Sequence, residues 1–242
     1  MGVTAVGCGS GPARRGGVAA AIKTKVHRCA AGSRRPLGSD KVAWAAVVRS
    51  SARAYRTPGS APFARFGRLN VNGVPTVFSI LGAVVTGACE PRWYRVELPI
   101  KPNGATGWVR ARDVEVAPVS TRILVDISER RVVLYRRGRP VLRTAAAVGA
   151  PGTPTPTGRY YVNQRLIPSD PSGPFGPGAI GISAFSNVLT GWAQGGPIAI
   201  HGTNEPWSIG HDVSNGCIRV RNPVLRRLFA AVPAGTPVVI RA

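Results

Sequence analysis

The sequence predicts a mainly β protein of two modest domains, and three observations support this prediction. The chain has 242 residues, a length that favours two modest domains over one. Its 30 glycines and 22 prolines disfavour a helical bundle. Short apolar runs alternate with turn residues, which is typical of short strands joined by turns. The apolar fraction of 44% is ordinary for a globular chain and excludes wholesale disorder.

The chain is strongly basic. Its 32 lysines and arginines outnumber 10 acidic residues and give a formal net charge of +22. A charge of this size implies anionic surroundings, which are nucleic acid, an acidic membrane surface or an acidic polymer. Composition alone leaves these three open. No apolar run approaches the roughly 18 residues that a membrane-spanning helix needs.

Residues 1–40 predict a basic, disordered leader. They contain seven basic residues, from Arg14 to Arg35, and no acidic residue before Asp40. The longest apolar run, Val18–Ile22, is shorter than the roughly 7–15 apolar residues of a secretory signal. Either the start is truncated or wrongly chosen, or the chain has no amino-terminal export signal.

Residues 41–118 predict a small β-barrel. Asn72-Gly73 and Pro102-Asn103-Gly104 are turn signals that fit hairpins. The segment from Trp93 to Val109, with a tryptophan before the last strand, resembles the end of a bacterial SH3-like domain. Ala117–Ser120 is interpreted as a linker. The strands expected here are Val47–Val48, Thr76–Ile80, Ala83–Val85, Trp93–Leu98 and Gly107–Arg110.

Residues 119–242 predict a second β domain with one or two short helices. Asn222 and Pro223 indicate a helix start, with Asn222 as the cap and Pro223 as the first helical residue, and Gly235 ends that helix. The Pro/Gly/Ser-rich segment Ile167–Gly181 predicts irregular structure and is a candidate lid. The strands expected here are Ile123–Ile127, Val132–Tyr135, Val141–Val148, Arg159–Val162, Ile198–Ile200 and Pro237–Ile240.

Cysteine and histidine carry the candidate chemistry. Cys217 lies in the run Ser214–Val220, sixteen positions after His201. No CxxC motif and no compact Cys/His cluster is present, so we expect no metal site and no cofactor. We predict that Cys217 is unpaired. In an exported protein two of the other three cysteines would pair, and these are Cys8, Cys29 and Cys89.

Cysteine acyl transfer has requirements that this neighbourhood meets. A free thiol with a pKa near 8.5 is only about 3% thiolate at neutral pH, so an imidazole must take its proton. Backbone N–H groups in a tight turn stabilise an oxyanion, and Gly216 permits such a turn. The second ring N–H of the base needs an acceptor, which Gly202 and Thr203 offer. The alternative is that Cys217 is a buried apolar residue and His201 a hydrogen-bonded core histidine.

These residues resemble the catalytic domain of the L,D-transpeptidases, the YkuD-type family. The resemblance rests on His201-Gly202-Thr203 followed by Ser214–Arg219, and on Gly149 with Thr153–Gly158 upstream. It covers roughly residues 121–241 and implies a YkuD-type β-sandwich. By this resemblance Cys217 would be the nucleophile and His201 its general base.

The resemblance also implies roles for the flanking residues. Gly202 would orient His201 through its carbonyl. Arg219 would either hold the turn of Cys217 through backbone carbonyls or bind a carboxylate of the substrate. The oxyanion hole would be formed by the N–H groups of Asn215, Gly216 and Cys217. The residues expected near the substrate cleft are Ser214, Thr203 and Arg219.

One position departs from the family pattern. The usual histidine two residues before the cysteine is Asn215 here, and an amide cannot exchange a proton at neutral pH. Asn215 would still be able to orient the substrate through hydrogen bonds. His211 either replaces that histidine in part or is a solvated loop residue.

The function that the resemblance implies is peptidoglycan L,D-transpeptidation in the cell envelope. The enzyme would form an acyl-enzyme with a tetrapeptide stem, release D-Ala and transfer the acyl group to an amine of a second stem, giving a 3–3 cross-link. With water as acceptor it would be an L,D-carboxypeptidase. A non-catalytic cell-wall-binding homologue is the alternative from another class, and Asn215 is the feature that favours it.

The expected partners follow from the same resemblance. They are donor and acceptor stem peptides, together with anionic cell-wall polymers that would suit the basic chain. Nucleic acid is disfavoured because the arginines are spread over the chain and no recognised nucleic-acid motif is present. Four aromatic residues are considered for the cleft, although aromatic residues near strands are more often core: Trp192, Trp207, Tyr160 and Tyr161.

Overall fold

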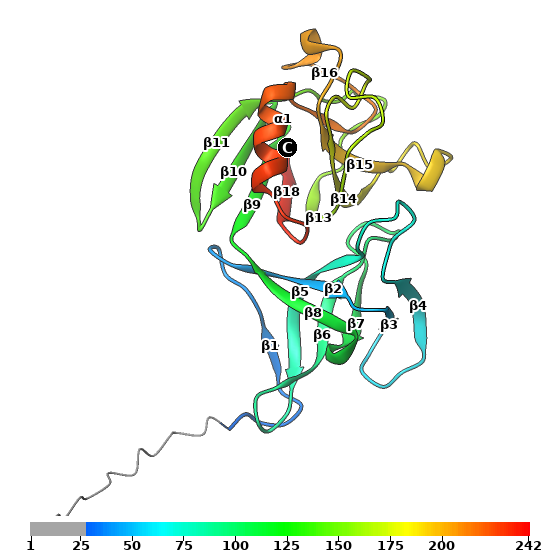
Figure 1. Cartoon of the computed structure of the whole chain (residues 1–242), viewed down its shortest axis with the longest axis vertical. Helices are drawn as coiled ribbons and strands as arrows, with labels where there is room; N and C mark the ends of the chain where they lie inside the picture. Colours follow the sequence, from blue (N-terminus) through cyan, green and yellow to red (C-terminus); the bar gives the residue numbers. More distant parts are fainter. Residues whose placement is uncertain (1–27) are drawn as a thin grey trace, which may run out of the picture.

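The structure is a computed structural model that describes residues 28–242, and it is mainly β (Figure 1). Two eight-stranded sheets, a two-stranded sheet, one α-helix and three short 3-10 helices make up the described residues. The predicted fold class is therefore confirmed. Of the predicted leader, residues 1–27 lie outside the described residues.

The N-terminal sheet is antiparallel throughout, in the order β4-β3-β7-β6-β5-β2-β8, with β1 paired to β5. Its core contains Phe78, Val96 and Leu98. A short 3-10 helix, η1 (Ala111–Asp113), leads into the last strand. The strands are β1 (Arg34–Pro36), β2 (Ala43–Val48), β3 (Ser51–Tyr55), β4 (Pro62–Gly67), β5 (Val77–Val85), β6 (Pro91–Glu97), β7 (Thr106–Arg110) and β8 (Val114–Val119).

Three expectations for this half need correction. Residues 28–40, which were assigned to the leader, carry β1 and pair with β5. Ala117–Ser120 is not a linker, because Ala117 pairs with Ala45 in the ladder between β8 and β2. The two strands expected at 76–80 and 83–85 form one strand, β5, whose pairing with β6 shifts register between Ile80 and Gly82. The resemblance to SH3-like domains stays a prediction.

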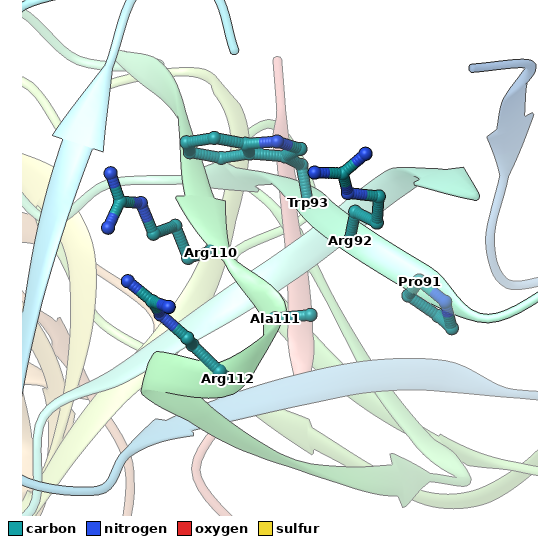
Figure 2. A pocket seen from close by; sticks show the side chains of 6 residues that line it. All are labelled: Pro91, Arg92, Trp93, Arg110, Ala111 and Arg112. Carbon is teal, nitrogen blue, oxygen red and sulfur yellow. The ribbon is translucent and has the colours of Figure 1, made fainter. Parts of the chain in front are cut away.

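A basic hollow of about 460 Å³ lies on the N-terminal sheet, where β6 begins and β7 ends. Arg92, Arg110 and Arg112 surround the indole of Trp93 (Figure 2). The Arg110 guanidinium stacks over the rings of Tyr55 and Trp93, 5.6 Å from each centroid. This stacking holds one cation in place without a carboxylate partner.

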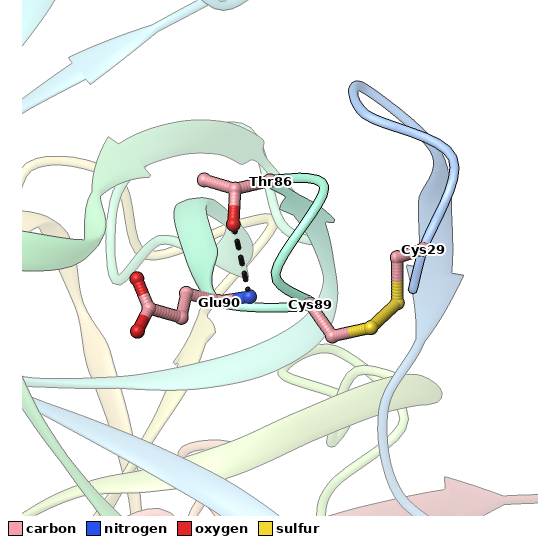
Figure 3. The surroundings of a disulfide bond; sticks show 4 residues. All are labelled: Cys29, Thr86, Cys89 and Glu90. Atoms are coloured by element: carbon pink, nitrogen blue, oxygen red, sulfur yellow. Dashed lines mark hydrogen bonds between the residues drawn. A yellow bond between two sulfur atoms is a disulfide. The ribbon is translucent and has the colours of Figure 1, made fainter. Parts of the chain in front are cut away.

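A disulfide between Cys29 and Cys89 ties the start of the described chain to the turn between β5 and β6 (Figure 3). The turn is closed by Thr86, whose Oγ1 accepts from the Glu90 N–H at 3.2 Å. The bond spans a sequence separation of 60 residues. In the chain-entropy description a loop of that length contributes roughly 4 kcal/mol to stability. The prediction that two cysteines besides Cys217 pair is confirmed, and Cys8 lies outside the described residues.

The C-terminal sheet is mixed, in the order β11-β10-β9-β18-β13-β14-β15-β17, with parallel pairs β9–β18 and β15–β17. It curls around the helix α1 (Asn222–Ala231), whose Leu225 and Leu228 join its core (Figure 1). Two further strands form a separate parallel pair, β12 (Val148–Gly149) and β16 (Asp212–Ser214). The strands of the large sheet are β9 (Thr121–Asp126), β10 (Arg131–Arg136), β11 (Arg139–Ala145), β13 (Gly158–Leu166), β14 (Ala179–Phe185), β15 (Pro197–His201), β17 (Ile218–Arg219) and β18 (Pro237–Arg241).

Two expectations for this half were partly wrong. The segment Ile167–Gly181 is irregular only as far as Gly178, because Ala179 begins β14. The helix is preceded by Arg221 as its N-cap, so Asn222 is already helical, and the helix ends at Ala231 rather than at Gly235. The two remaining 3-10 helices are η2 (Ala193–Gly195) and η3 (Pro206–Ser208).

The two sheets contact each other through buried polar groups. The Tyr161 hydroxyl donates to the carbonyl of Val77 at 3.0 Å, and Tyr161 is fully buried. The Ser183 hydroxyl donates to the carboxyl of Glu97 at 2.5 Å. Buried donors and acceptors left without partners would be costly, so these bonds fix how the sheets meet.

Candidate active site

His201 and Cys217 lie on two neighbouring parallel strands. His201 ends β15 and pairs with Arg219 on β17, which Cys217 immediately precedes. Side chains alternate along a strand, and Ile200 and Ile218 face the core. His201, Cys217 and Arg219 therefore share the opposite face of the sheet.

That face opens into a cleft of about 740 Å³ that His201, Cys217 and Arg219 all line. Four side-chain amides also line it, from Asn72, Gln164, Gln194 and Asn215. No carboxylate is among the described residues of its wall, and Arg219 is the guanidinium there. A wall of amide groups with one cation suits a peptide that carries carboxylates.

His201 is held in one tautomer. Its Nδ1 lies 2.6 Å from the carbonyl oxygen of Gly202. A carbonyl only accepts, so Nδ1 carries the hydrogen and Nε2 is left as the basic atom. Burial lowers the pKa of His201 to about 4, the hydrogen bond to Gly202 opposing this and the charge of Arg219 adding to it. The imidazole is neutral at neutral pH and can accept a proton.

Gly202 has no room for a side chain. A Cβ there would lie 2.3 Å from Oδ1 of Asn222 and 2.9 Å from Cδ of Pro177. This close approach keeps the carbonyl of Gly202 beside the ring of His201. Phe175, from the irregular segment before β14, covers the other side, with its ring centroid 4.9 Å from that of His201.

Cys217 is a free thiol. Burial raises the pKa of Cys217, while a backbone hydrogen bond from Ala199 and the charge of Arg219 act in the opposite direction. With the imidazole also neutral, the pair rests as thiol and imidazole at neutral pH. Proton transfer then belongs to the step in which the sulfur attacks, rather than preceding it.

The turn that carries Cys217 is closed by its own hydrogen bonds. The Ser214 hydroxyl donates to the carbonyl of Cys217 at 2.5 Å and accepts from the Gly216 N–H at 3.1 Å. Gly216 has φ of 102°, a left-handed region that favours glycine. The hydroxyl of Ser214 is thus occupied within the turn, and so is the N–H of Gly216.

A second segment braces this turn from outside. The Thr155 hydroxyl donates to the carbonyl of Gly216 at 2.9 Å and accepts from the Gly149 N–H at 2.8 Å. The Thr153 hydroxyl donates to the carbonyl of Ser214 at 2.9 Å. The upstream block noticed in the sequence, residues 149–158, thus supports the cysteine turn.

The sequence model of the YkuD L,D-transpeptidase catalytic domain matches residues 120–240, half of the chain. The chain belongs to the L,D-transpeptidase family. It is 40% identical over 119 residues to the YkuD protein of Bacillus licheniformis and 39% identical over 118 residues to that of Bacillus subtilis. Each match covers 49% of this chain and 64% of the relative, so the chain spans less than two thirds of their length. The solved catalytic domain of an Enterococcus faecium L,D-transpeptidase is 25% identical, with a TM-score of 0.37, over 50% of this chain and 96% of that chain.

Of the residues expected near the cleft of this L,D-transpeptidase domain, Thr203 lies outside it and Arg219 has a partner that the sequence did not indicate. Thr203 is buried outside the cleft, where its N–H donates to Oδ1 of Asn222 at 2.8 Å and its hydroxyl accepts from the Glu205 N–H at 2.9 Å. Arg219 lines the cleft, but its Nη1 lies 2.5 Å from Oε2 of Glu205. Arg219 is thus held by a carboxylate rather than by backbone carbonyls, an arrangement the sequence did not indicate.

The remaining candidates divide between cleft and surface. Asn215 is exposed at the cleft, and His211 is exposed outside it. Of the four aromatic residues considered, Trp192 lines the cleft with 53% of its surface exposed, whereas Trp207 lies outside. Tyr160 and Tyr161 are buried in the core, which was the alternative for them, and they do not line the cleft.

Several residues of the site were missed in the sequence. Thr155 holds the cysteine turn through a hydrogen bond to Gly216, and Glu205 holds Arg219. Asn222 accepts a hydrogen bond from Thr203, just after the end of β15. Asn72 reaches the cleft from the N-terminal sheet. Of these residues, Thr155 alone was indicated in the sequence as part of the site, because it belongs to the block at residues 149–158. In residues 28–242 no group of three or more His, Cys, Asp or Glu is placed to hold a metal ion, and no helix there is long and apolar enough to cross a membrane.

Proposed function

We propose that this protein is a peptidoglycan L,D-transpeptidase that uses Cys217 as its nucleophile and His201 as its general base. The observation that carries the proposal is the placement of both side chains on one face of adjoining parallel strands, lining one cleft. Membership of the L,D-transpeptidase family supports the reaction class.

The first half-reaction releases D-Ala from a tetrapeptide stem. The sulfur of Cys217 attacks the carbonyl between the third residue of the stem and the terminal D-Ala, while its proton passes to Nε2 of His201. The tetrahedral intermediate collapses as His201 returns that proton to the amine of D-Ala. The C–N bond breaks and a thioester remains on Cys217.

The second half-reaction transfers the acyl group. A side-chain amine of a second stem attacks the thioester, its proton passing to His201, and the sulfur of Cys217 leaves as the thiol. The product is a 3–3 cross-link. The neutral imidazole and thiol found at rest suit this cycle, because each step moves one proton between the same two groups.

The developing oxyanion needs donors that the turn leaves available. Because Ser214 occupies the N–H of Gly216, we assign the oxyanion hole to the N–H groups of Asn215 and Cys217. Ser214 is accordingly a positioning residue that closes the turn. Gly202 positions His201 in the same sense.

Arg219 and Asn215 are proposed to contact the substrate. The guanidinium of Arg219 has donors beyond the one held by Glu205, and these would bind a stem-peptide carboxylate. The exposed amide of Asn215 would hydrogen-bond the stem without exchanging protons. Pro174 and Phe175 line the cleft from the segment before β14, so this segment remains our candidate lid.

The N-terminal half would also act in the cell wall. We propose two domains, an N-terminal domain with an SH3-like fold that spans β1 to β8 and a catalytic domain from β9 onwards. The basic hollow around Trp93 would bind anionic wall polymers, since three arginines line it and only Arg112 has a carboxylate near it, that of Asp113 at 3.8 Å. The Cys29–Cys89 disulfide supports an extracytoplasmic location, in the cell envelope.

Mass spectrometry of the protein incubated with a disaccharide-tetrapeptide tests the proposal. A cross-linked dimer, absent with Cys217→Ala, is the expected result. A trimmed tripeptide alone would make the protein an L,D-carboxypeptidase. The exposed Asn204→Ala variant is a matched control that should behave as wild type.

A non-catalytic cell-wall-binding homologue is the second candidate, and Asn215 favours it. A carbapenem separates the two, because a covalent adduct of its mass forms only on a reactive thiol. We expect the adduct on wild type and its absence from Cys217→Ala. Wild type without an adduct and with unchanged stem peptide would overturn the enzymatic proposal.

A further inference from the structure

Two loops of the N-terminal sheet reach the cleft of the C-terminal sheet. One joins β4 to β5 and carries Asn70 and Asn72, and the other joins β6 to β7 and carries Asn103. Figure 1 shows the cyan loop after β4 rising towards the segment between β14 and β15. Asn72 is itself part of the cleft wall.

Asn72 contacts Gln164 and Gln194 through its side-chain amide. Its Nδ2 donates to Oε1 of Gln164 at 2.8 Å, and Nε2 of Gln194 donates to its Oδ1 at 2.9 Å. Asn70 donates to the same Oε1 of Gln164 at 2.9 Å. The amide of Asn72 thus joins the N-terminal sheet to β13 and to η2 at one end of the cleft.

Asn103 holds the other end of the segment that contains Gln194. Its Nδ2 donates to the carbonyl of Phe185 at 2.8 Å, and its Oδ1 accepts from the N–H of Phe185 at 2.8 Å. The side chain pairs with Phe185 as a neighbouring strand would. The ammonium of Lys101 lies 5.8 Å from the Phe185 ring centroid.

The segment between β14 and β15, residues 186–196, contributes Trp192, Ala193 and Gln194 to the wall of the cleft. An irregular segment of this length has many conformations of similar energy unless it is tied down at several points. Two of the attachments that hold this segment come from loops of the N-terminal sheet.

We propose that Asn72 is a positioning residue for substrate binding, acting through Gln194 to hold the wall that carries Trp192. We call the contacts of Asn70, Asn72 and Asn103 with Gln164, Phe185 and Gln194 the amide clasp. The inference rests on the proposed transpeptidase function and extends it, because it makes the N-terminal sheet part of the stem-peptide site. The clasp leaves Cys217 and His201 untouched.

This arrangement predicts a change in KM with little change in kcat. In Asn72→Ala the wall loses its hold, and we expect KM for the disaccharide-tetrapeptide to rise about 5- to 10-fold, as for the loss of one or two hydrogen bonds. Gln194→Ala, at an exposed position, should do the same. KM of the variant with both substitutions should exceed the larger of the two single-variant values only slightly, because Asn72 and Gln194 act as a unit.

Controls separate this inference from the proposed function. Asn204→Ala, exposed and outside the cleft, should leave KM unchanged. Carbapenem acylation of Cys217 should proceed at similar rates in wild type, Asn72→Ala and Gln194→Ala, since it requires the reactive pair more than the wall. Absence of acylation in wild type would count against the function itself.

Two outcomes would overturn the inference while leaving the function intact. One is an unchanged KM in both single variants, with wild type active. The other is a fall in kcat at constant KM, which would mean that the clasp acts on Cys217. If Asn72→Ala fails to fold, the surface variant Gln194→Ala still decides between these results.

Discussion

The imidazole of His201 is buried beside Phe175, and its Nδ1 hydrogen rests on the carbonyl of Gly202. Burial lowers its pKa to about 4. A general base works only in its neutral form, so activity should persist well below the ordinary histidine pKa of about 6.5. We predict that kcat/KM is nearly constant from neutral pH to about pH 5 and falls as the pH passes through about 4.

A rate profile on the disaccharide-tetrapeptide checks this prediction, with circular dichroism confirming that the protein stays folded. A half-loss of kcat/KM near pH 6.5 would contradict it. The free energy of unfolding should also fall as the pH is lowered. The unfolded histidine binds a proton at higher pH than the folded one, so the contribution of His201 to stability is lost as pH falls from 6.5 towards 4.

For single residues, the sequence indicated those that lie in short motifs and missed contacts between residues far apart in the chain. His201 and Cys217 lie in two short motifs, and the structure brings both side chains to one cleft. Glu205 contacts Arg219 across 14 positions, and nothing in either motif distinguishes it from an ordinary surface acid. Neither of the two roles considered for Arg219 in the sequence included this contact with Glu205.

Among the elements, the segment 149–158 and the cysteine turn depend on each other. Thr155 connects them through one hydroxyl, which is buried and fully used. We predict that Thr155→Val, which keeps the shape and removes both bonds, lowers the free energy of unfolding by roughly 1–3 kcal/mol and slows acylation of Cys217. Urea unfolding and the rate of carbapenem adduct formation are the two measurements.

Thr157→Val is the matched control, because Thr157 belongs to the same segment and is exposed. It should change neither stability nor acylation beyond about 0.5 kcal/mol or its equivalent in rate. Equal behaviour of the two variants would show that the hydroxyl of Thr155 does not hold the turn.

The helix α1 shows why element boundaries were harder to predict than element types. The helix itself was predicted, and its Leu225 and Leu228 are buried in the core. Asn222 has the side chain of a cap, yet its Oδ1 accepts from the Thr203 N–H, so a contact 19 residues away decides its role. Likewise Ala117–Ser120 resembled a linker until its pairing with β2 was known.

At the scale of the whole molecule, the pH dependence of stability depends on the buried carboxyl of Glu97, which lies where the two sheets meet. Burial raises the pKa of Glu97 to about 7, and the hydrogen bond from Ser183 opposes this. Because the folded pKa exceeds that of the unfolded chain, the contribution of Glu97 to stability is full below about pH 4.5 and is lost as pH rises through 7. We predict that wild type loses up to roughly 3 kcal/mol relative to Glu97→Gln between pH 5 and 8.

Thermal or urea unfolding of both proteins across that range measures the difference. Glu90→Gln removes an exposed carboxylate from the turn before β6 and is the control that should follow the wild-type curve. Parallel curves for wild type and Glu97→Gln would mean that the carboxyl does not titrate in the folded protein over this range. The sequence placed Glu97 in a strand, but its burial against Ser183 depends on how the two sheets meet.

The basic hollow lies at the far end of β6 from this contact. β6 is seven residues long from Pro91 to Glu97, a span of about 20 Å. A polymer bound around Trp93 would therefore leave the cleft open. We predict that the triple variant Arg92→Gln, Arg110→Gln, Arg112→Gln binds inorganic polyphosphate at least about tenfold more weakly at low salt.

The control triple variant carries Arg139→Gln, Arg143→Gln and Arg226→Gln, which removes the same charge from exposed sites on the other sheet and helix. If the hollow is a site, the control loses much less affinity, and the difference between the two variants persists as salt is raised. If net charge alone attracts polyanions, the two variants weaken equally at every salt concentration. Stacked Arg110, with a guanidinium already fixed by two rings, is the reason to expect the first result.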